Sequence, residues 1–306
     1  MSWDDFISHL NVNNVIHNLH NLEDKPPKCI LWGIAPTGDI HIGYLPYVGI
    51  LNKLRRFGSN VICLIANYHA YLDSKKTDWE KIESRTKHYK DFLRAYNLGD
   101  TVIESKDEYT RKSYIEGFFK FSYLLPAKDL EEWAGRTLRS YLNKNYKLSD
   151  YIYVGTQIFD IIYFNIDSSI CGIDESGIYR FSLSFIENIT KKRYYYLYIP
   201  MIPGIYKDEM HASDDSSNKI IVTEREKEIN HKLKIYLKKC LKKKELPKLV
   251  FMLEKFVFPL FDKETNSEIL SRLYDYTEDD IEFISKNVSQ RLSILLEPVR
   301  QHMEVI

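Results

Sequence analysis

Short apolar segments that alternate with helical ones predict an α/β fold, in which the strands form a doubly wound parallel sheet. Two apolar runs, 28–35 and 60–72, read as strands because turn residues precede or follow them. The segments 41–56 and 78–97 carry apolar residues at helical spacing, and strand character returns at 194–202. Strands separated by helices favour parallel pairing, because each parallel connection has to cross over the sheet.

The pattern changes after the last predicted strand. From about residue 224 onward it is helical, so we expect a sheet domain at 1–223, which begins with an amphipathic helix, and an all-helical domain at 224–306. Residues 100–150 carry mixed helical signals without strand alternation, which indicates a helical insertion in the sheet domain. The run 151–167 is apolar with polar residues at intervals and is compatible with a further helix.

The composition is that of a globular protein with a sizeable core. The 306 residues are 44% hydrophobic, and 43 Lys and Arg balance 43 Asp and Glu, which excludes a histone-like polycation. No apolar run reaches the roughly 18 residues of a membrane span, and the N-terminal sequence has no secretion-signal pattern. We therefore expect a cytoplasmic protein. The four cysteines lack zinc-motif spacing, so no metal site is expected.

The segment PTGDIHIGY, 36–44, follows the first predicted strand and leads into a helix. A strand, a turn of small residues and a helix start together form a common phosphate site, because helix N-terminal amides point at the anion. Neither a dinucleotide nor a P-loop glycine pattern is present. On the residues alone, an ordinary strand-to-helix turn with an exposed His41 remains an equal alternative.

His41-Ile42-Gly43-Tyr44 also stands where the class I aminoacyl-tRNA synthetases have their HIGH signature. The chain resembles the tyrosine-specific branch of that family found in archaea and eukaryotes. Further matching segments follow in order: LIANYHAYLD (64–73), YVGTQIFD (153–160), CGIDES (171–176), MIPGIYKDEMHAS (201–213), FVFPL (256–260) and RLSILLEPVRQHM (291–303). The resemblance implies a Rossmann-like catalytic domain, a helical anticodon-binding domain and a homodimer formed through the insertion.

The activity that the resemblance implies is that of a tyrosine–tRNA ligase in protein biosynthesis. Tyrosine and ATP would form tyrosyl-adenylate, and the tyrosyl group would pass to tRNA(Tyr), with Mg²⁺ accompanying ATP. Such a reaction needs oriented reactants and donors aimed at the phosphate oxygens. The matched catalytic residues are Thr37, His41 and Tyr44. The matched ATP-binding residues are Gly33, Ala35, Gly43, Gly172, Asp174, Met210 and Ser213.

The predicted tyrosine pocket centres on Tyr153, Gln157 and Asp160. Spacings of four and three place them on one face of a helix. The resemblance assigns Tyr153 and Gln157 to the α-amino group of the substrate and Asp160 to its phenolic hydroxyl. A buried carboxylate that Phe would leave unpaired would discriminate strongly against Phe. The alternative is a core helix with three incidental polar residues.

The sequence departs from the family at three of its site positions. Leu31 replaces a tyrosine that also contacts the substrate hydroxyl, and Glu175 replaces a glutamine of the amino-acid pocket. Glu209 replaces the first lysine of the K-M-S-x-S loop, where a carboxylate would repel the departing pyrophosphate. Lys207, Lys219 or His211 are candidate substitutes. The alternative hypothesis is a catalytically impaired or repurposed homologue that binds tRNA or an aminoacyl-nucleotide without normal tyrosine adenylation.

The segment 232–248 is strongly basic, with eight Lys and one Glu. Such a helix face is compatible with phosphate-backbone contacts, with an acidic membrane surface or with simple solvation. Its place in the C-terminal region, where the family engages tRNA, favours tRNA. The predicted contacts are Lys238, Lys239, Lys242 and Lys243.

Overall fold

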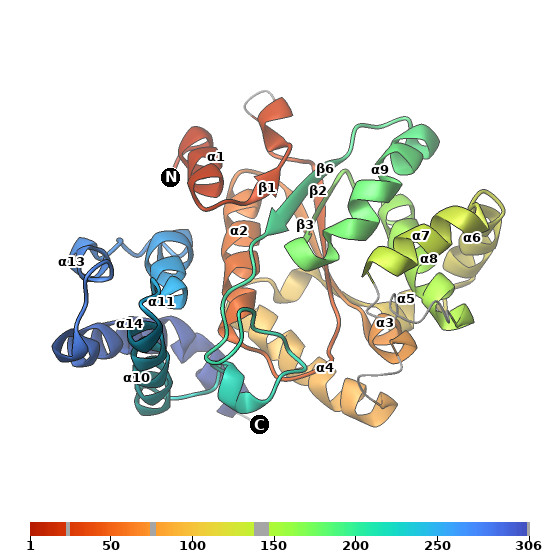
Figure 1. Cartoon of the computed structure of the whole chain (residues 1–306). Helices are drawn as coiled ribbons and strands as arrows, with labels where there is room; N and C mark the ends of the chain where they lie inside the picture. The colour runs from red at the N-terminus through yellow and green to blue at the C-terminus, as the bar shows by residue number, and fades with distance from the viewer. Residues whose placement is uncertain (23–24, 74–77, 138–146, 305–306) are drawn as a thin grey trace. The chain divides into compact units, whose positions relative to one another are not determined.

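A computed structural model describes residues 1–22, 25–73, 78–137 and 147–304 (Figure 1). The chain divides into two compact units, and neither is one continuous segment. The sheet unit comprises Met1–Thr37, Leu54–Lys87 and Thr101–Pro200. The helical unit comprises Gly38–Lys53, His88–Asp100 and Met201–Ile306. The domain boundary expected near residue 223 remains a prediction.

The sheet unit contains the six-stranded sheet, whose order is β1-β6-β5-β2-β3-β4. All neighbouring strands are parallel except β1, which pairs antiparallel with β6. This arrangement confirms the predicted α/β class. The strands are β1 (Ile16–His17), β2 (Cys29–Ile34), β3 (Asn60–Ile65), β4 (Val102–Glu104), β5 (Ser168–Gly172) and β6 (Tyr195–Ile199).

Helices surround this sheet in the same unit. They are α1 (Trp3–Val12), α3 (Asn67–Leu72), α5 (Ser105–Glu108), α6 (Lys112–Ser122), α7 (Ala127–Thr137), α8 (Leu148–Tyr163) and α9 (Ser176–Thr190), with 3₁₀ turns at Leu19–Asn21 and Ile173–Glu175. The helices α2 (Leu45–Arg56) and α4 (Trp79–Ala95) each contain a point at which the chain passes from one unit to the other.

A 3₁₀ turn at Gly99–Thr101 spans the point at which the chain returns to the sheet unit. The helical unit contains the remaining helices. They are the 3₁₀ turns Ile42–Tyr44 and Ser216–Asn218, α10 (Glu226–Lys243), α11 (Lys248–Met252), a π-helical stretch at Leu253–Val257, α12 (Phe258–Leu260), α13 (Ser267–Arg272) and α14 (Glu278–Glu304). From Glu226 on, the described residues form helices and no strands, as expected. No helix among the described residues is both long and apolar enough to cross a membrane.

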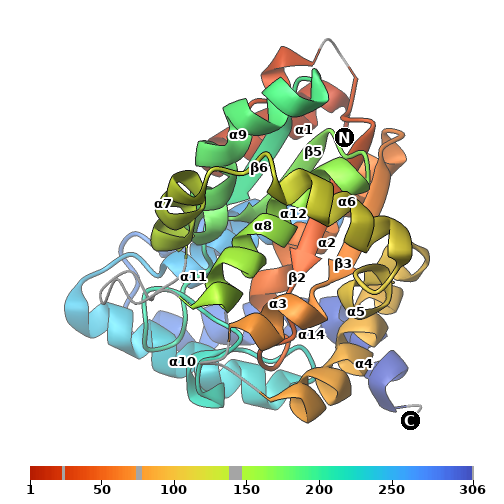
Figure 2. The same ribbon diagram turned by 90° about the vertical axis from the view of Figure 1, so that its right-hand side faces the viewer.

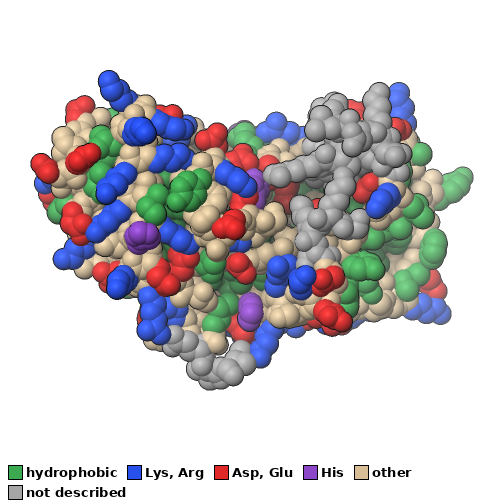
Figure 3. All heavy atoms as spheres, turned by 60° about the horizontal axis from the view of Figure 1, so that its bottom comes forward, with side chains coloured by type: hydrophobic (Ala, Val, Ile, Leu, Met, Phe, Trp, Pro, Cys, Tyr) green, Lys and Arg blue, Asp and Glu red, His purple; other side chains and the backbone are tan. Residues whose placement is uncertain are grey.

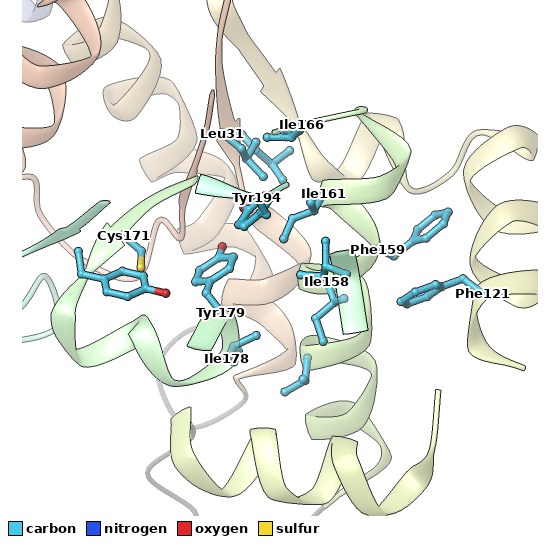
Figure 4. Close-up of a cluster of buried hydrophobic side chains, with 14 of the residues drawn as sticks. Leu31, Phe121, Ile158, Phe159, Ile161, Ile166, Cys171, Ile178, Tyr179 and Tyr194 are labelled. Carbon is cyan, nitrogen blue, oxygen red and sulfur yellow. The ribbon is translucent and has the colours of Figure 1, made fainter. Parts of the chain in front are cut away.

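The main core of the sheet unit lies between the sheet and the helices α8 and α9, which Figures 1 and 2 show on the same face of the sheet. Leu31 and Cys171 contribute from β2 and β5, Ile158 and Ile161 from α8, and Tyr179 from α9 (Figure 4). Helix α8 presents an apolar side chain to this core at nearly every turn. Polar residues on α8 are therefore held rigidly at the edge of a packed core.

Three elements differ from the sequence prediction. The apolar run 60–72 is a strand only to Ile65, and the residues from Asn67 onward form α3. The Asn67 side chain is buried there and donates to Thr86 Oγ1 at 2.8 Å. Residues 100–150 include the short strand β4, which pairs with β3 and is too short to show alternation. Residues 138–146 of the predicted insertion lie outside the described residues. Strand β5 was not predicted, since it begins with two serines.

Candidate active site

The three predicted pocket residues lie on α8, as expected. Asp160 is 2% exposed. Gln157 Nε2 donates to the Tyr179 hydroxyl of α9 at 3.1 Å, and the ring of Tyr153 meets the edge of His69 at a centroid distance of 4.7 Å. Gln157 thus contacts α9 and Tyr153 contacts α3, and the convergence of the three residues on one ligand remains a prediction.

Asp160 is already hydrogen-bonded within the protein. The Tyr114 hydroxyl donates to Oδ1 at 2.7 Å, and the Tyr109 hydroxyl donates to Oδ2 at 2.5 Å. Burial raises the pKa of Asp160 to about 7, and these two hydrogen bonds act in the opposite direction. The expectation that Phe would leave this carboxylate unpaired is therefore wrong, because two protein donors satisfy it.

Tyr109 and Tyr114 were missed by the sequence analysis. A buried carboxylate requires a partner, so the burial of Asp160 on an apolar helix was a signal that donors exist. The sequence did not indicate which residues donate, because the two tyrosines lie 51 and 46 residues from Asp160.

Leu31 is 3% exposed and belongs to the apolar cluster between the sheet and α8, together with Ile161 and Ile166 (Figure 4).

Acidic side chains surround Tyr153. Burial first, and then the negative charges of Glu175, Asp73 and Asp174, raise the pKa of Tyr153. Asp174 and Glu175 lie exposed in the 3₁₀ turn Ile173–Glu175, directly after Gly172 at the end of β5. A neutral phenol in a negative field is suited to bind an ammonium group.

The predicted nucleotide residues of the sheet unit lie at the carboxyl ends of β2 and β5, which pair in parallel. Gly33 is the last residue but one of β2, Ala35 and Thr37 follow that strand, and Gly172 and Asp174 lie at the end of β5 and in the next turn. Gly33 is exposed, and a side chain there would meet nothing within 4 Å. Thr37 N donates to Ala35 O at 2.8 Å, and Arg85 Nη1 donates to Thr37 O at 2.8 Å. Ligands of parallel sheets bind beyond the carboxyl ends of the strands, which is where these residues lie.

His41, in the helical unit, is 5% exposed, so the alternative of an exposed histidine is wrong. Its Nδ1 accepts from Gly43 N at 3.1 Å, and a Cβ at Gly43 would lie only 2.6 Å from the ring. Burial, followed by the charges of Lys219 and His211, lowers the pKa of His41 to about 3. The imidazole is therefore neutral, with its proton on Nε2, and can donate one hydrogen bond.

Tyr44 lies beside this imidazole, with a ring-centroid distance of 4.9 Å to His41. Its hydroxyl is 3.3 Å from the Tyr89 hydroxyl, which donates to Gly38 O at 3.1 Å. The Tyr44 phenol thus keeps a polar contact at the place where the family has its second signature histidine.

The loop 201–219 of the helical unit is organised by Asn218, which is 3% exposed. Asn218 Oδ1 accepts from Tyr206 N at 2.8 Å and from Lys207 N at 2.9 Å, and Nδ2 donates to Asp214 Oδ2 at 2.9 Å. A Cβ at Gly204 would lie 2.5 Å from the Asn218 side chain, so glycine is needed there. The loop therefore has one defined conformation.

The charges of this loop are largely paired. Glu209 is exposed, with Oε2 3.0 Å from His211 Nε2. Lys207 forms an ion pair with Asp214. Burial would raise the pKa of Asp214, but hydrogen bonds from Lys207, from the His211 amide and from Asn218 outweigh it and lower the pKa to about 2.

The second candidate substitute, Lys219, is 1% exposed. Its Nζ donates to Ala212 O at 2.6 Å and lies 3.4 Å from Asp39 Oδ2. Lys219 therefore holds the loop and does not present its charge to solvent. Of the two predicted nucleotide contacts in the loop, Met210 is buried and Ser213 is exposed.

Most of the basic segment 232–248 lies in α10, which ends at Lys243 and whose Leu233, Tyr236 and Leu237 are buried. Lys and Arg side chains gather at the left of the face in Figure 3, where α10 and α14 lie in Figure 1. The exposed lysines of this segment include Lys238, Lys242 and Lys243.

Lys239 differs from these neighbours. It is half-buried, and its Nζ donates to Tyr206 O at 2.8 Å and to Ile205 O at 3.3 Å. Lys239 therefore supports the loop 201–219. No three His, Cys, Asp or Glu side chains within the described ranges are arranged to hold a metal ion.

Known proteins resemble this chain over most of its length. The family described as tRNA synthetases class I (W and Y) matches residues 23–291. The probable cytoplasmic tyrosine–tRNA ligase of Vairimorpha ceranae is 30% identical over 252 residues, which cover 79% of this chain and 73% of that protein. The cytoplasmic tyrosine–tRNA ligase of Gallus gallus is 27% identical over 220 residues, 70% of this chain but only 41% of that longer protein.

Solved structures share the fold. The tyrosyl-tRNA synthetase of Archaeoglobus fulgidus complexed with L-tyrosine has a TM-score of 0.73 at 20% identity, covering 93% of this chain and 92% of that one. The tryptophanyl-tRNA synthetase of Aeropyrum pernix has a TM-score of 0.73 at 14% identity, covering 100% and 90%. Because the family match spans most of the sequence, this chain belongs to the class I tRNA synthetases of the W and Y group.

Proposed function

We propose that this chain is a tyrosine–tRNA ligase that activates tyrosine with ATP and transfers it to tRNA(Tyr) in the cytoplasm. The observation that carries the proposal is the buried acceptor Asp160 on the same helix as Tyr153 and Gln157. Such an acceptor suits a phenolic hydroxyl better than an apolar side chain. The curated relatives named above are cytoplasmic tyrosine–tRNA ligases, which agrees.

In the amino-acid site, Tyr153 and Gln157 would bind the α-amino group, and the negative charges of Asp174 and Glu175 would favour its ammonium form. Asp160 would accept from the phenolic hydroxyl. Each Asp160 oxygen accepts one protein hydrogen bond and keeps a lone pair for the substrate. Leu31 would supply only apolar contact.

In the ATP site, the tyrosine carboxylate would attack the α-phosphorus while the bond to pyrophosphate breaks. His41 would donate from Nε2 to a phosphate oxygen without changing its protonation state. Thr37 and Tyr44 would add donors, and Gly172 and Asp174 would hold the ribose. Gly33, Ala35 and Gly43 would leave room for ATP, and Met210 and Ser213 would shape the loop around it. Mg²⁺ would enter with ATP, whose phosphates supply oxygen ligands.

The decisive experiment is tyrosine-dependent ATP–pyrophosphate exchange. We expect exchange with tyrosine and weaker exchange with phenylalanine, because Asp160 remains satisfied with either substrate and only tyrosine adds a hydrogen bond. Tryptophan serves as the control substrate of the same family. Silence with tyrosine over a wide concentration range would contradict the proposal.

Glu209→Lys should raise the exchange rate on the order of 10- to 100-fold, because a cation would replace the carboxylate that repels pyrophosphate. Steady-state kinetics with saturating ATP would measure this. Asp208→Lys makes the same charge change at the exposed neighbouring position and is the matched control. An equal gain from both variants would show a general charge effect and reject the specific role of position 209.

We propose that three exposed lysines in the C-terminal half of α10, Lys238, Lys242 and Lys243, bind the tRNA backbone. Reversing Lys238, Lys242 and Lys243 to Glu should weaken tRNA binding and lower the slope of log affinity against log salt by about 2, because fewer counterions are released. Lys239 is left unchanged, since it supports the loop. Reversal of the exposed Lys227, Lys263 and Lys286 gives the same net charge and should have a smaller effect. Equal losses would refute the assignment.

We propose a homodimer formed through α6. Ile115, Phe119 and Tyr123 recur every four residues, and their side chains are 42%, 71% and 91% exposed. Phe119→Asp together with Tyr123→Asp should convert the dimer into a monomer in analytical ultracentrifugation, because each places a charge in an apolar interface. Ile294→Asp, at a site 65% exposed on α14, is the control. A double variant that stays dimeric would place the interface elsewhere.

A further inference from the structure

The donors to Asp160 come from outside the helix that carries it. Tyr109 follows α5, and Tyr114 lies in the first turns of α6. Their rings stack with centroids 4.3 Å apart and planes 17° from parallel. Each hydroxyl reaches a different carboxylate oxygen, at 2.5 Å and 2.7 Å. Two donors, one on each oxygen, fix both the position and the plane of the carboxylate.

We propose that Tyr109 and Tyr114 are positioning residues that orient the Asp160 carboxylate and favour its ionised form, so that it can accept from the side-chain hydroxyl of the amino-acid substrate. This inference rests on the proposed function and deepens it. Asp160 remains the acceptor, and the two residues that position it do not lie on the predicted pocket helix.

The surroundings of Asp160 explain why donors are needed. Burial favours the neutral acid, and the two hydroxyls are the groups that offset it among the described residues. His69 of α3 faces the same hydroxyl, with Nδ1 3.4 Å from Tyr109 Oη, and burial lowers the pKa of His69 to about 4. His69 is therefore neutral near pH 7 and supplies no positive charge. A protonated Asp160 would act as a hydrogen-bond donor through its own O–H, and that oxygen would accept less readily from the substrate.

The chain offers a matched control in the same aromatic cluster. Tyr163 packs on Tyr114 with ring centroids 4.8 Å apart, but its hydroxyl is 3.1 Å from Ser113 Oγ. Tyr163→Phe removes a hydroxyl from the cluster without removing a donor to Asp160. Tyr114→Phe and Tyr109→Phe each remove one of the two donors and keep the ring.

The experiment measures Asp160 directly by ¹³C NMR titration of aspartate carboxyl groups in the full chain, with the signal assigned by Asp160→Asn. We expect Tyr114→Phe and Tyr109→Phe each to raise the pKa of Asp160 by about one unit, since a hydrogen bond to the charged form is lost. In the pH profile of kcat/KM for tyrosine in the exchange reaction, the low-pH limb should move to higher pH together with the pKa of Asp160. Tyr163→Phe should move neither.

The outcomes separate the two proposals. An unshifted Asp160 pKa in both folded variants overturns this inference, even if the wild type exchanges normally. A shift of equal size in Tyr163→Phe also overturns it, because the effect would then be one of packing. Absence of exchange in the wild type sinks the proposed function, while the NMR shift would still support the link between the hydroxyls and Asp160. If Tyr114→Phe fails to fold by circular dichroism, Tyr109→Phe decides.

Discussion

The carboxyl group of Asp160 lies in the aromatic core of the sheet unit, and the structure around it follows from the cost of placing a charge there. The hydroxyls of Tyr109 and Tyr114 contact this carboxylate, so the segment from α5 into α6 packs against α8. The stacked rings of those two tyrosines then become part of the core beside Phe159. The same two side chains therefore both hydrogen-bond to the buried carboxylate and fill part of the core.

The helical unit solves a different problem, which is to hold two loops of irregular backbone without a sheet. Asn218 satisfies the backbone amides of one loop, and Lys219 joins that loop to Asp39. A Cβ at Gly38 would lie 1.8 Å from Ala212 O, so the backbones touch at this point. Buried polar side chains here act together with a short antiparallel backbone bridge between His41 and Ile221.

Periodicity was sufficient to predict β2, β6 and all of β3, although the predicted strand continued into α3, and the apolar run that forms α8 was compatible with a helix. It was insufficient for β5, whose Ser168 and Ser169 are fully buried polar residues in a strand. Periodicity also could not predict that His41 is buried. The neighbouring Ile42 N donates to Ile220 O, which lies far away in the sequence. Local patterns report which face of an element is apolar. They carry no information about which distant segment covers that face.

Lys239 combines two duties that the exposed lysines beside it do not share. It contributes to the positive field of α10, and its ammonium group also holds the carbonyl groups of Ile205 and Tyr206. A substitution of Lys239 therefore has to preserve both roles, since one that keeps the positive charge can still lose the contacts to the loop. Arginine would preserve the charge but not the compact reach to two carbonyls. The basic face of α10 and the loop 201–219 therefore share one residue, and both roles constrain its substitution.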